Sequence, residues 1–276
     1  VVIEASSFQL SHSKFIQPDY AFLLNITNDH LDWHGNMSNY TNSKLKIFIN
    51  QKKNQFSLTN DKLKKIFKKR KFLGKLIVPK EKNYKKIKNK IKNNYLKLNI
   101  NNENMNFVYT FSRLLKISKK NFIAAINSFI GLPHRYEIFL KKKNIVFIND
   151  SKATSFVSSK FALSNSKNVY WVLGGLPKKN DRISLDKIKK NIIKCYIVGK
   201  NTNFFQKQVQ NKINFSITTN FRKTLFTILK DIQSSNVKEN TILLSPAAAS
   251  YDQFKNFEKR GNEFKKLSKI YARKYI

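Results

Sequence analysis

The chain has 276 residues and a formal net charge of +38, because 54 lysines and arginines face only 16 aspartates and glutamates. Hydrophobic residues make up 41% of the sequence, which is enough to build packed cores and excludes a wholly disordered chain. A single cysteine excludes a disulfide framework and a cysteine-based zinc site. The sequence has no run near the roughly 18 apolar residues of a membrane span, and it shows no signal-peptide pattern.

The excess of basic residues has two interpretations. A nucleic-acid-binding protein concentrates Lys, Arg and aromatic residues in one patch. Here lysine is spread along the chain with much Asn, Ile and Phe and only 7 Gly and 5 Pro, a composition typical of A/T-rich codon usage. The densest basic stretch, residues 62–97, contains an apolar segment and predicts a solvated helix and hairpin. Codon bias is therefore the favoured interpretation, and nucleic-acid binding is the alternative.

The first half of the chain predicts short strands and helices. Residues 1–3 are Val-Val-Ile and predict a buried strand that has already begun, as in a piece of a longer chain. Further strands are expected at residues 20–26, 55–58 and 72–78, and helices at 38–49, 105–117 and 119–130. Ser38 and Ser118 are the expected N-caps. Gly131-Leu132-Pro133 then interrupts the pattern, so we expect domains at 1–130 and 131–276.

Beyond residue 143, expected strands and helices alternate. The strands are expected at residues 144–148, 169–173, 195–198, 215–218 and 241–244, and the helices at 156–163, 185–193, 203–209, 220–232 and 251–275. This alternation predicts a doubly wound α/β domain built on a parallel sheet. Such sheets bind ligands at the carboxyl ends of their strands. Polar motifs follow three of the expected strands, at residues 149–152, 174–178 and 245–246, which predicts a binding edge there.

Three residues in the first half are candidates for a metal site. Glu4 ends the first expected strand, and a carboxylate there suits a hydrated Mg²⁺ on a phosphate, although a surface residue or helix cap explains it as well. His30 follows a strand, and a packed histidine is its simpler interpretation. Lys44 lies on an expected helix, where a solvated lysine is the simpler interpretation.

In the second half, the candidates suit an anionic ligand. Arg135 presents a fork that fits a phosphate or carboxylate, or a surface ion pair. Asp150 ends a strand and suits a ribose, while the Ser and Thr after it can equally cap the next helix. The small residues at 246–250 lie between strand and helix, where backbone amides can approach an anion.

Taken in order, six motifs resemble those of the Mur ligase family and span almost the whole chain. These motifs are residues 4–10, residues 25–32, Tyr40 with Lys44, residues 131–137, residues 149–154 and residues 245–264. The stretch Ser-Pro-Ala-Ala-Ala-Ser-Tyr-Asp-Gln-Phe at 245–254 is similar to that of the members that add D-glutamate. The resemblance implies the latter part of a central P-loop-type ATPase domain at 1–130 and a complete Rossmann-like C-terminal domain at 131–276.

The activity that the resemblance implies is ATP-dependent ligation of D-glutamate to UDP-N-acetylmuramoyl-L-alanine, through an acyl phosphate, in peptidoglycan precursor synthesis. Glu4, His30 and Lys44 match positions that serve Mg²⁺, and the family carbamylates the matching lysine, which turns a cation into a carboxylate-like anion. The matching nucleotide contacts are Asn101, Asn104, Arg135, Asp150 and Lys152. The matching substrate contacts are Ser6 and Gln9 for the muramoyl substrate, and Thr154, Lys178, Ser245 and Phe254 for D-glutamate. The resemblance also implies a cytoplasmic monomer with no membrane or specific nucleic-acid partner.

One family motif does not occur in this sequence. The phosphate-loop pattern Gly-x-x-x-x-Gly-Lys-[Ser/Thr] is absent, since Gly74-Lys75 lacks the earlier glycine. We therefore expect that loop and the UDP-binding domain to precede Val1, and we expect this chain alone to be inactive. Two alternatives stay open, namely a basic nucleic-acid-binding protein and a decayed relative kept only for its interactions.

Overall fold

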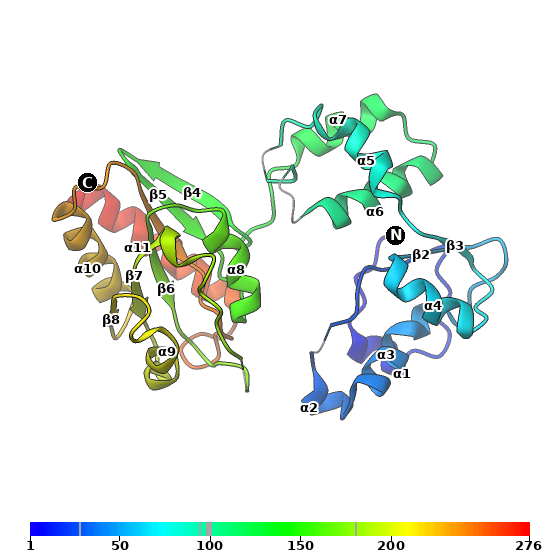
Figure 1. The fold of residues 1–276 in the computed structure, drawn as a ribbon, viewed down its shortest axis with the longest axis horizontal. Helices are drawn as coiled ribbons and strands as arrows, with labels where there is room; N and C mark the ends of the chain where they lie inside the picture. The colour runs from blue at the N-terminus through cyan, green and yellow to red at the C-terminus, as the bar shows by residue number, and fades with distance from the viewer. Residues whose placement is uncertain (28, 94, 98–100, 180) are drawn as a thin grey trace. The chain divides into compact units, whose positions relative to one another are not determined.

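The structure, a computed structural model, describes residues 1–27, 29–93, 95–97, 101–179 and 181–276 (Figure 1). The chain forms two compact units, Val1–Phe129 and Ile130–Ile276, which are described separately below. Both are α/β units built on sheets with parallel strands, as the sequence predicted. Within the described residues, no helix is both long and apolar enough to cross a membrane.

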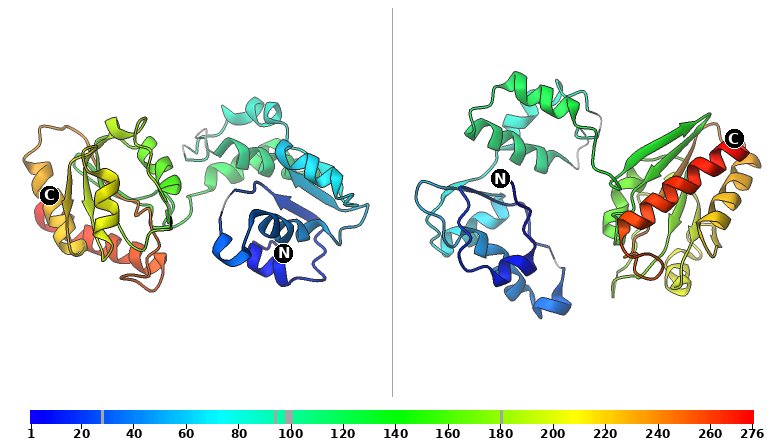
Figure 2. Two further views of the ribbon diagram at one scale, coloured as in Figure 1. Left: turned by 60° about the horizontal axis from the view of Figure 1, so that its bottom comes forward. Right: turned by 180° about the vertical axis from the view of Figure 1, so that it is seen from behind.

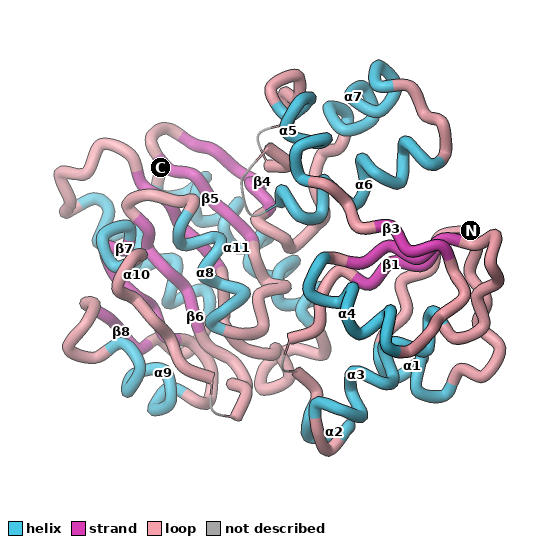
Figure 3. Tube along the Cα trace, turned by 45° about the vertical axis from the view of Figure 1, so that its right-hand side comes forward, coloured by secondary structure: helices cyan, strands magenta, loops and turns pink. Residues whose placement is uncertain are grey.

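The first unit contains a three-stranded parallel sheet in the order β1-β2-β3 (Figure 3). Its strands are β1 (Tyr20–Leu23), β2 (Phe56–Thr59) and β3 (Lys75–Ile77). Its helices are α1 (Ser7–His12), α2 (Leu31–His34), α3 (Met37–Leu45), the 3₁₀ turn η1 (Lys46–Phe48), α4 (Asp61–Lys69), α5 (Glu81–Lys88), α6 (Asn102–Leu114) and α7 (Lys119–Ser128). Buried side chains of β1, α3, η1 and α4 form one apolar cluster, and those of α5, α6 and α7 form another.

Several expectations for the first unit need correction. Residues 1–3 are not a buried strand: Val1, Val2 and Ile3 are exposed, because β1 pairs only with β2 and offers these residues no described partner. The third helix is capped by Asn36, whose side chain accepts from the Asn39 N–H, and not by Ser38. The prediction that Ser118 caps α7 is confirmed, since its hydroxyl accepts from the Asn121 N–H.

The second unit is a six-stranded sheet in the order β4-β5-β9-β6-β7-β8, parallel except for β4. Its strands are β4 (Glu137–Lys142), β5 (Ile145–Asn149), β6 (Val169–Leu173), β7 (Ile192–Ile197), β8 (Phe215–Ile217) and β9 (Asn240–Leu244). Its helices are α8 (Phe156–Ser164), the 3₁₀ turn η3 (Lys189–Asn191), α9 (Thr202–Val209), α10 (Phe221–Gln233) and α11 (Phe257–Tyr275).

Helices cover both faces of this sheet, which confirms the doubly wound class. Alternate residues of one strand face opposite clusters: Trp171 packs with side chains of α8 and α9, whereas Tyr170 packs with those of α10 and α11. Helices α10 and α11 lie side by side (Figure 2, right). Strand β9 lies between β5 and β6, so the loops that follow these three strands are neighbours at the carboxyl edge.

Two helix expectations in the second unit are wrong. The segment 185–193 contains only η3 before β7 begins at Ile192, because the branched apolar residues there pair with β6. The last helix starts at Phe257 and not at residue 251, since Asn256 caps it by accepting from the Lys259 N–H. Strand β4 was not expected at all; it is an edge strand that completes an antiparallel hairpin with β5.

Candidate functional site

The carboxyl edge of the second sheet holds most of the residues that the sequence singled out there. The loops after its parallel strands are tied to one another by specific contacts. Backbone hydrogen bonds join Leu176, after β6, to Ala249, after β9, at 2.9 Å in both directions. The Asn201 side chain donates to the Gly175 carbonyl at 3.0 Å, and the Lys200 N–H donates to Asp252 at 3.2 Å. The edge is therefore a connected framework.

Asp150 directly follows β5 at this edge and is 7% exposed. One of its carboxylate oxygens accepts from the Ser245 hydroxyl at 2.7 Å, and the other accepts from the Tyr136 N–H at 3.0 Å. Burial raises the pKa of Asp150 to about 6, although these hydrogen bonds and the positive charge of Arg135 act in the opposite direction. Each carboxylate oxygen has a second lone pair, so the group can accept from a further hydroxyl.

A second buried network holds the hairpin that leads into Asp150. The Asn149 amide donates to His134 Nδ1 and to Glu137 Oε2, both at 2.9 Å, and Lys265 of α11 donates to Glu137 Oε1 at 2.7 Å. Burial lowers the pKa of His134 and so favours its neutral form. Burial alone would raise the pKa of Glu137, but the bonds from Lys265, His134 N–H and Asn149 outweigh it and lower the pKa. The motifs at 131–137 and 149–154 contain three of these residues, whereas no motif indicated Lys265.

The other predicted residues of the second unit differ in accessibility. Arg135 and Lys178 are exposed, and Thr154 is half-buried. The Lys152 ammonium lies 3.9 Å from the centroid of the Phe257 ring, a cation–π contact that keeps it at the edge.

Two of the predicted substrate-binding side chains in this unit make contacts with other residues of the protein. Ser245 is fully buried, and its hydroxyl is directed to Asp150. Phe254 stacks on Phe221 of α10, with ring centroids 5.6 Å apart.

In the first unit, the Tyr40 ring lies near two of the three predicted metal-site residues. The Lys44 ammonium is 5.1 Å from its centroid, and the His30 ring centroid is 6.3 Å away. His34, which the sequence analysis missed, packs on the same ring at 5.1 Å. It is buried, and its Nε2 lies 3.0 Å from the Ser7 hydroxyl. The structure thus brings His30 and Lys44 to one aromatic surface.

The remaining predicted residues of the first unit lie elsewhere. Glu4 is exposed and makes no hydrogen bond or ion pair among the described residues. Ser6 and Gln9 form a capping box at the start of α1, with the Gln9 N–H donating to Ser6 Oγ at 3.2 Å. Asn101 donates to the Tyr95 carbonyl at 2.6 Å, and Asn104 is exposed on α6.

No preformed metal site stands out in the part of the chain that the structure describes. It contains no group of three or more His, Cys, Asp and Glu side chains placed to hold an ion. Asn28 of the 25–30 motif lies outside the described residues.

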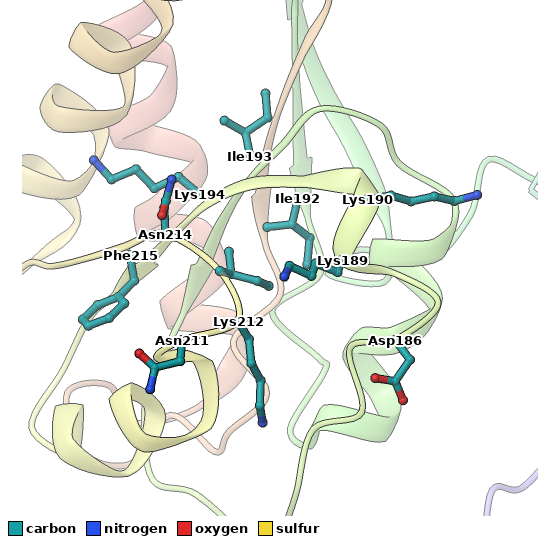
Figure 4. A pocket seen from close by; sticks show the side chains of 11 residues that line it. Asp186, Lys189, Lys190, Ile192, Ile193, Lys194, Asn211, Lys212, Asn214 and Phe215 are labelled. Atoms are coloured by element: carbon teal, nitrogen blue, oxygen red, sulfur yellow. The ribbon is translucent and has the colours of Figure 1, made fainter.

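A wide concavity of the second unit lies away from these residues. It measures about 1190 Å³ and is lined by the start of β7, by residues 211–214 and by Phe215, the first residue of β8, so it lies at the amino edge of the sheet (Figure 4). Four lysines line it, but Lys190 and Lys194 point to opposite sides, and Lys194 already pairs with Asp231 at 2.7 Å. Since its charged groups do not converge, we place the candidate site at the carboxyl edge, where buried polar groups do.

Comparison with known proteins identifies relatives of this chain. Residues 1–129 match the model of the Mur ligase middle domain. The UDP-N-acetylmuramoylalanine–D-glutamate ligase of Rickettsia felis is 35% identical over 97% of this chain. The chain belongs to the Mur ligase family. It spans 64% of the length of the Rickettsia relative.

Solved structures share the fold of this Mur ligase chain at low sequence identity. MurF ligase from Thermotoga maritima, in complex with ADP, has a TM-score of 0.60 at 15% identity, over 94% of this chain and 63% of that one. The bifunctional folylpolyglutamate synthase/dihydrofolate synthase from Yersinia pestis, complexed with AMPPNP and a Mn ion, has a TM-score of 0.55 at 11% identity, over 94% and 62%.

Proposed function

We propose that this chain serves ATP-dependent ligation of D-glutamate to UDP-N-acetylmuramoyl-L-alanine, in the synthesis of peptidoglycan precursors. The observation that carries the proposal is the 35% identity to a ligase of that name, which extends over both units of the chain. The soluble nucleotide substrate suits a reaction in the cytoplasm. That the protein is a monomer stays a prediction.

The second unit, as the C-terminal ligase domain, would contact the nucleotide through Arg135, Asp150 and Lys152. The donor set fits a nucleotide: a buried carboxylate with acceptor capacity left suits a ribose hydroxyl, and two basic side chains nearby suit phosphate. Ser245 is buried, so we propose that it acts through Asp150, whose carboxylate it orients. Phe254 would likewise shape the pocket through its packing, leaving Thr154 and Lys178 to meet D-glutamate.

The first unit, as the central ATPase domain, would present Glu4, His30 and Lys44 to Mg²⁺, Ser6 and Gln9 to the muramoyl substrate, and Asn101 and Asn104 to the nucleotide. Mg²⁺ keeps several waters and takes one or two carboxylates together with substrate phosphates, so an exposed Glu4 fits without a protein cage. The ion would neutralise phosphate charge during transfer.

Lys44 fits this scheme only in a modified form, because an ammonium does not bind a metal ion. The unmodified Lys44 ammonium instead makes a cation–π contact with the Tyr40 ring. We propose that carbamylation replaces this contact with a negatively charged group that lies near His30.

Phosphate release tests the proposal. The chain alone, supplied with ATP, Mg²⁺, the UDP-linked substrate and D-glutamate, should release none, because its sequence lacks the phosphate-loop motif. Joined to the part of the Rickettsia relative that this chain does not cover, it should release phosphate only when D-glutamate is present. Equal phosphate release with and without D-glutamate, from a folded fusion that unfolds in a single thermal transition, would refute the proposal. Salt-sensitive DNA binding at physiological ionic strength would favour the nucleic-acid alternative instead.

A further inference from the structure

Arg260 is a buried arginine for which the roles above give no explanation. It lies in the first turns of α11, it is 3% exposed, and burial lowers its pKa to about 10, so it is charged at neutral pH. A cation near a helix N-terminus opposes the helix dipole, and burial of a guanidinium is unfavourable in itself. Stability alone therefore gives no reason for an arginine here.

The guanidinium joins two loops of the carboxyl edge. Its Nε donates to the Ser151 hydroxyl at 3.0 Å, and its Nη2 donates to the carbonyl oxygens of Ser151 at 2.8 Å and Ala248 at 2.9 Å. Ser151 follows β5 and Ala248 follows β9. The Ser151 hydroxyl in turn donates to the Phe257 carbonyl at 2.8 Å, which ties the start of α11 to the same point.

A third loop, after β6, rests on the same side chain. A Cβ at Gly175 would lie 3.1 Å from Arg260 Nη1 and 2.3 Å from the Ala249 carbonyl oxygen, so only glycine allows this approach. Nη1 is buried and has no hydrogen-bond partner among the described residues. The β6 loop is therefore held against the guanidinium by packing, and by its backbone bridge to Ala249.

We propose that Arg260 is a positioning residue that holds the loops after β5, β6 and β9 in one arrangement and so preforms the pocket for the amino-acid substrate. This inference rests on the proposed function, because Thr154 and Lys178 lie on two of these loops. A planar guanidinium can bond several carbonyl and hydroxyl oxygens at fixed angles, whereas a lysine is a point charge on a flexible stem. A pocket that is already ordered loses less entropy when the substrate binds.

Amide hydrogen exchange on the 276-residue chain tests the loop contacts without any ligand. In Arg260→Lys and Arg260→Met, exchange at residues 151–154 and 247–250 should speed up by about tenfold, a local opening of the kind these contacts suppress. Exchange in α10 should not change. Lys269→Met is the matched control, since Lys269 lies on the same helix, is exposed and belongs to neither network described above. Unchanged loop exchange in both Arg260 variants would overturn the proposal.

Titration of the same variants with D-glutamate, followed by NMR, tests the pocket. The Kd should rise by about tenfold for Arg260→Lys and stay near the parent value for Lys269→Met. Equal affinity in Arg260→Lys and the parent would overturn the positioning role. If the parent itself binds no D-glutamate, the proposed function fails, and the exchange result alone then decides whether Arg260 holds the loops. If Arg260→Met does not fold, Gly175→Ala gives a second perturbation, and it should loosen the same loops.

Discussion

Replacing Asp150 by Asn should stabilise the second unit at neutral pH. Native burial raises the pKa of Asp150 from 3.8 to about 6, so the folded protein favours the protonated form. Each pKa unit is worth about 1.4 kcal/mol, so ionised Asp150 costs about 3 kcal/mol of folding free energy above pH 7. Asn is uncharged at every pH. Its carbonyl can accept from Tyr136, and the Ser245 hydroxyl can turn to accept from its NH₂ group.

Because the pKa of Asp150 is raised on folding, the stability difference between the Asn variant and its parent depends on pH. The stability that protonated Asp150 provides is fully present below pH 3.8 and is lost as pH rises through about 6. The advantage of Asn should therefore be about 3 kcal/mol at pH 7.5 and about 1 kcal/mol at pH 4.5. His134 acts in the opposite direction, because its lowered pKa removes stability as pH falls below 6.5. Since both proteins contain His134 and Glu137, the difference between them isolates Asp150.

Urea unfolding followed by tryptophan fluorescence measures this difference. Trp171 is fully buried and donates to the Ser245 carbonyl at 2.7 Å, so it reports on the neighbourhood of Asp150. The only other tryptophan, Trp33, lies in the first unit and can be changed to Phe in both proteins. A variant that is less stable than its parent at pH 7.5, or an advantage that grows as pH falls, would refute the reasoning.

Three further predictions concern single positions. Gly174→Ala should destabilise the second unit by more than about 3 kcal/mol in urea unfolding, because the φ of Gly174 is +135° and a Cβ there would lie 1.8 Å from a backbone oxygen. Gly35→Ala, where a Cβ meets open space, should cost only about 1 kcal/mol. Equal losses in the two variants would contradict this reasoning. Ser118→Ala should lower stability by about 1 kcal/mol by calorimetry through loss of the α7 cap, and an unchanged melting temperature would show that the cap contributes nothing. Lys44→Ala in the fused ligase should abolish phosphate release, and bicarbonate should not restore it; a fully active variant would remove Lys44 from the site.

The second sheet was predictable because its strands carry a local signal. Strand β6 occupies residues 169–173 as expected, since five consecutive buried residues between two helices read as a central strand. The hairpin strand β4 carries no such signal. It is half-buried at a sheet edge and ends in lysines, so only its pairing with β5 makes it a strand. The apolar residues 1–3 show the converse: they have a strand pattern, but no strand among the described residues pairs with them.

The candidate site was predictable in position but not in its contacts. Motifs at strand ends placed Asp150 and Ser245 at one edge, because carboxyl ends of parallel strands lie together. That the Ser245 hydroxyl turns to Asp150 depends on a pairing of residues 95 positions apart. Arg260 and Ser151 are 109 positions apart, and no local pattern indicated their contact. Spacing along the chain identifies an edge of the sheet, whereas hydrogen-bond partners follow from the packing.

The most direct test of the account is the identity of the product. The chain, fused to the part of the Rickettsia relative that it does not cover, would be incubated with ATP, Mg²⁺, UDP-N-acetylmuramoyl-L-alanine and either D-glutamate or L-glutamate. The mass of the nucleotide product would then be measured by mass spectrometry. The account predicts addition of one glutamyl residue with D-glutamate and none with L-glutamate. A folded, ATP-binding fusion that adds a different amino acid, or adds none, would contradict it.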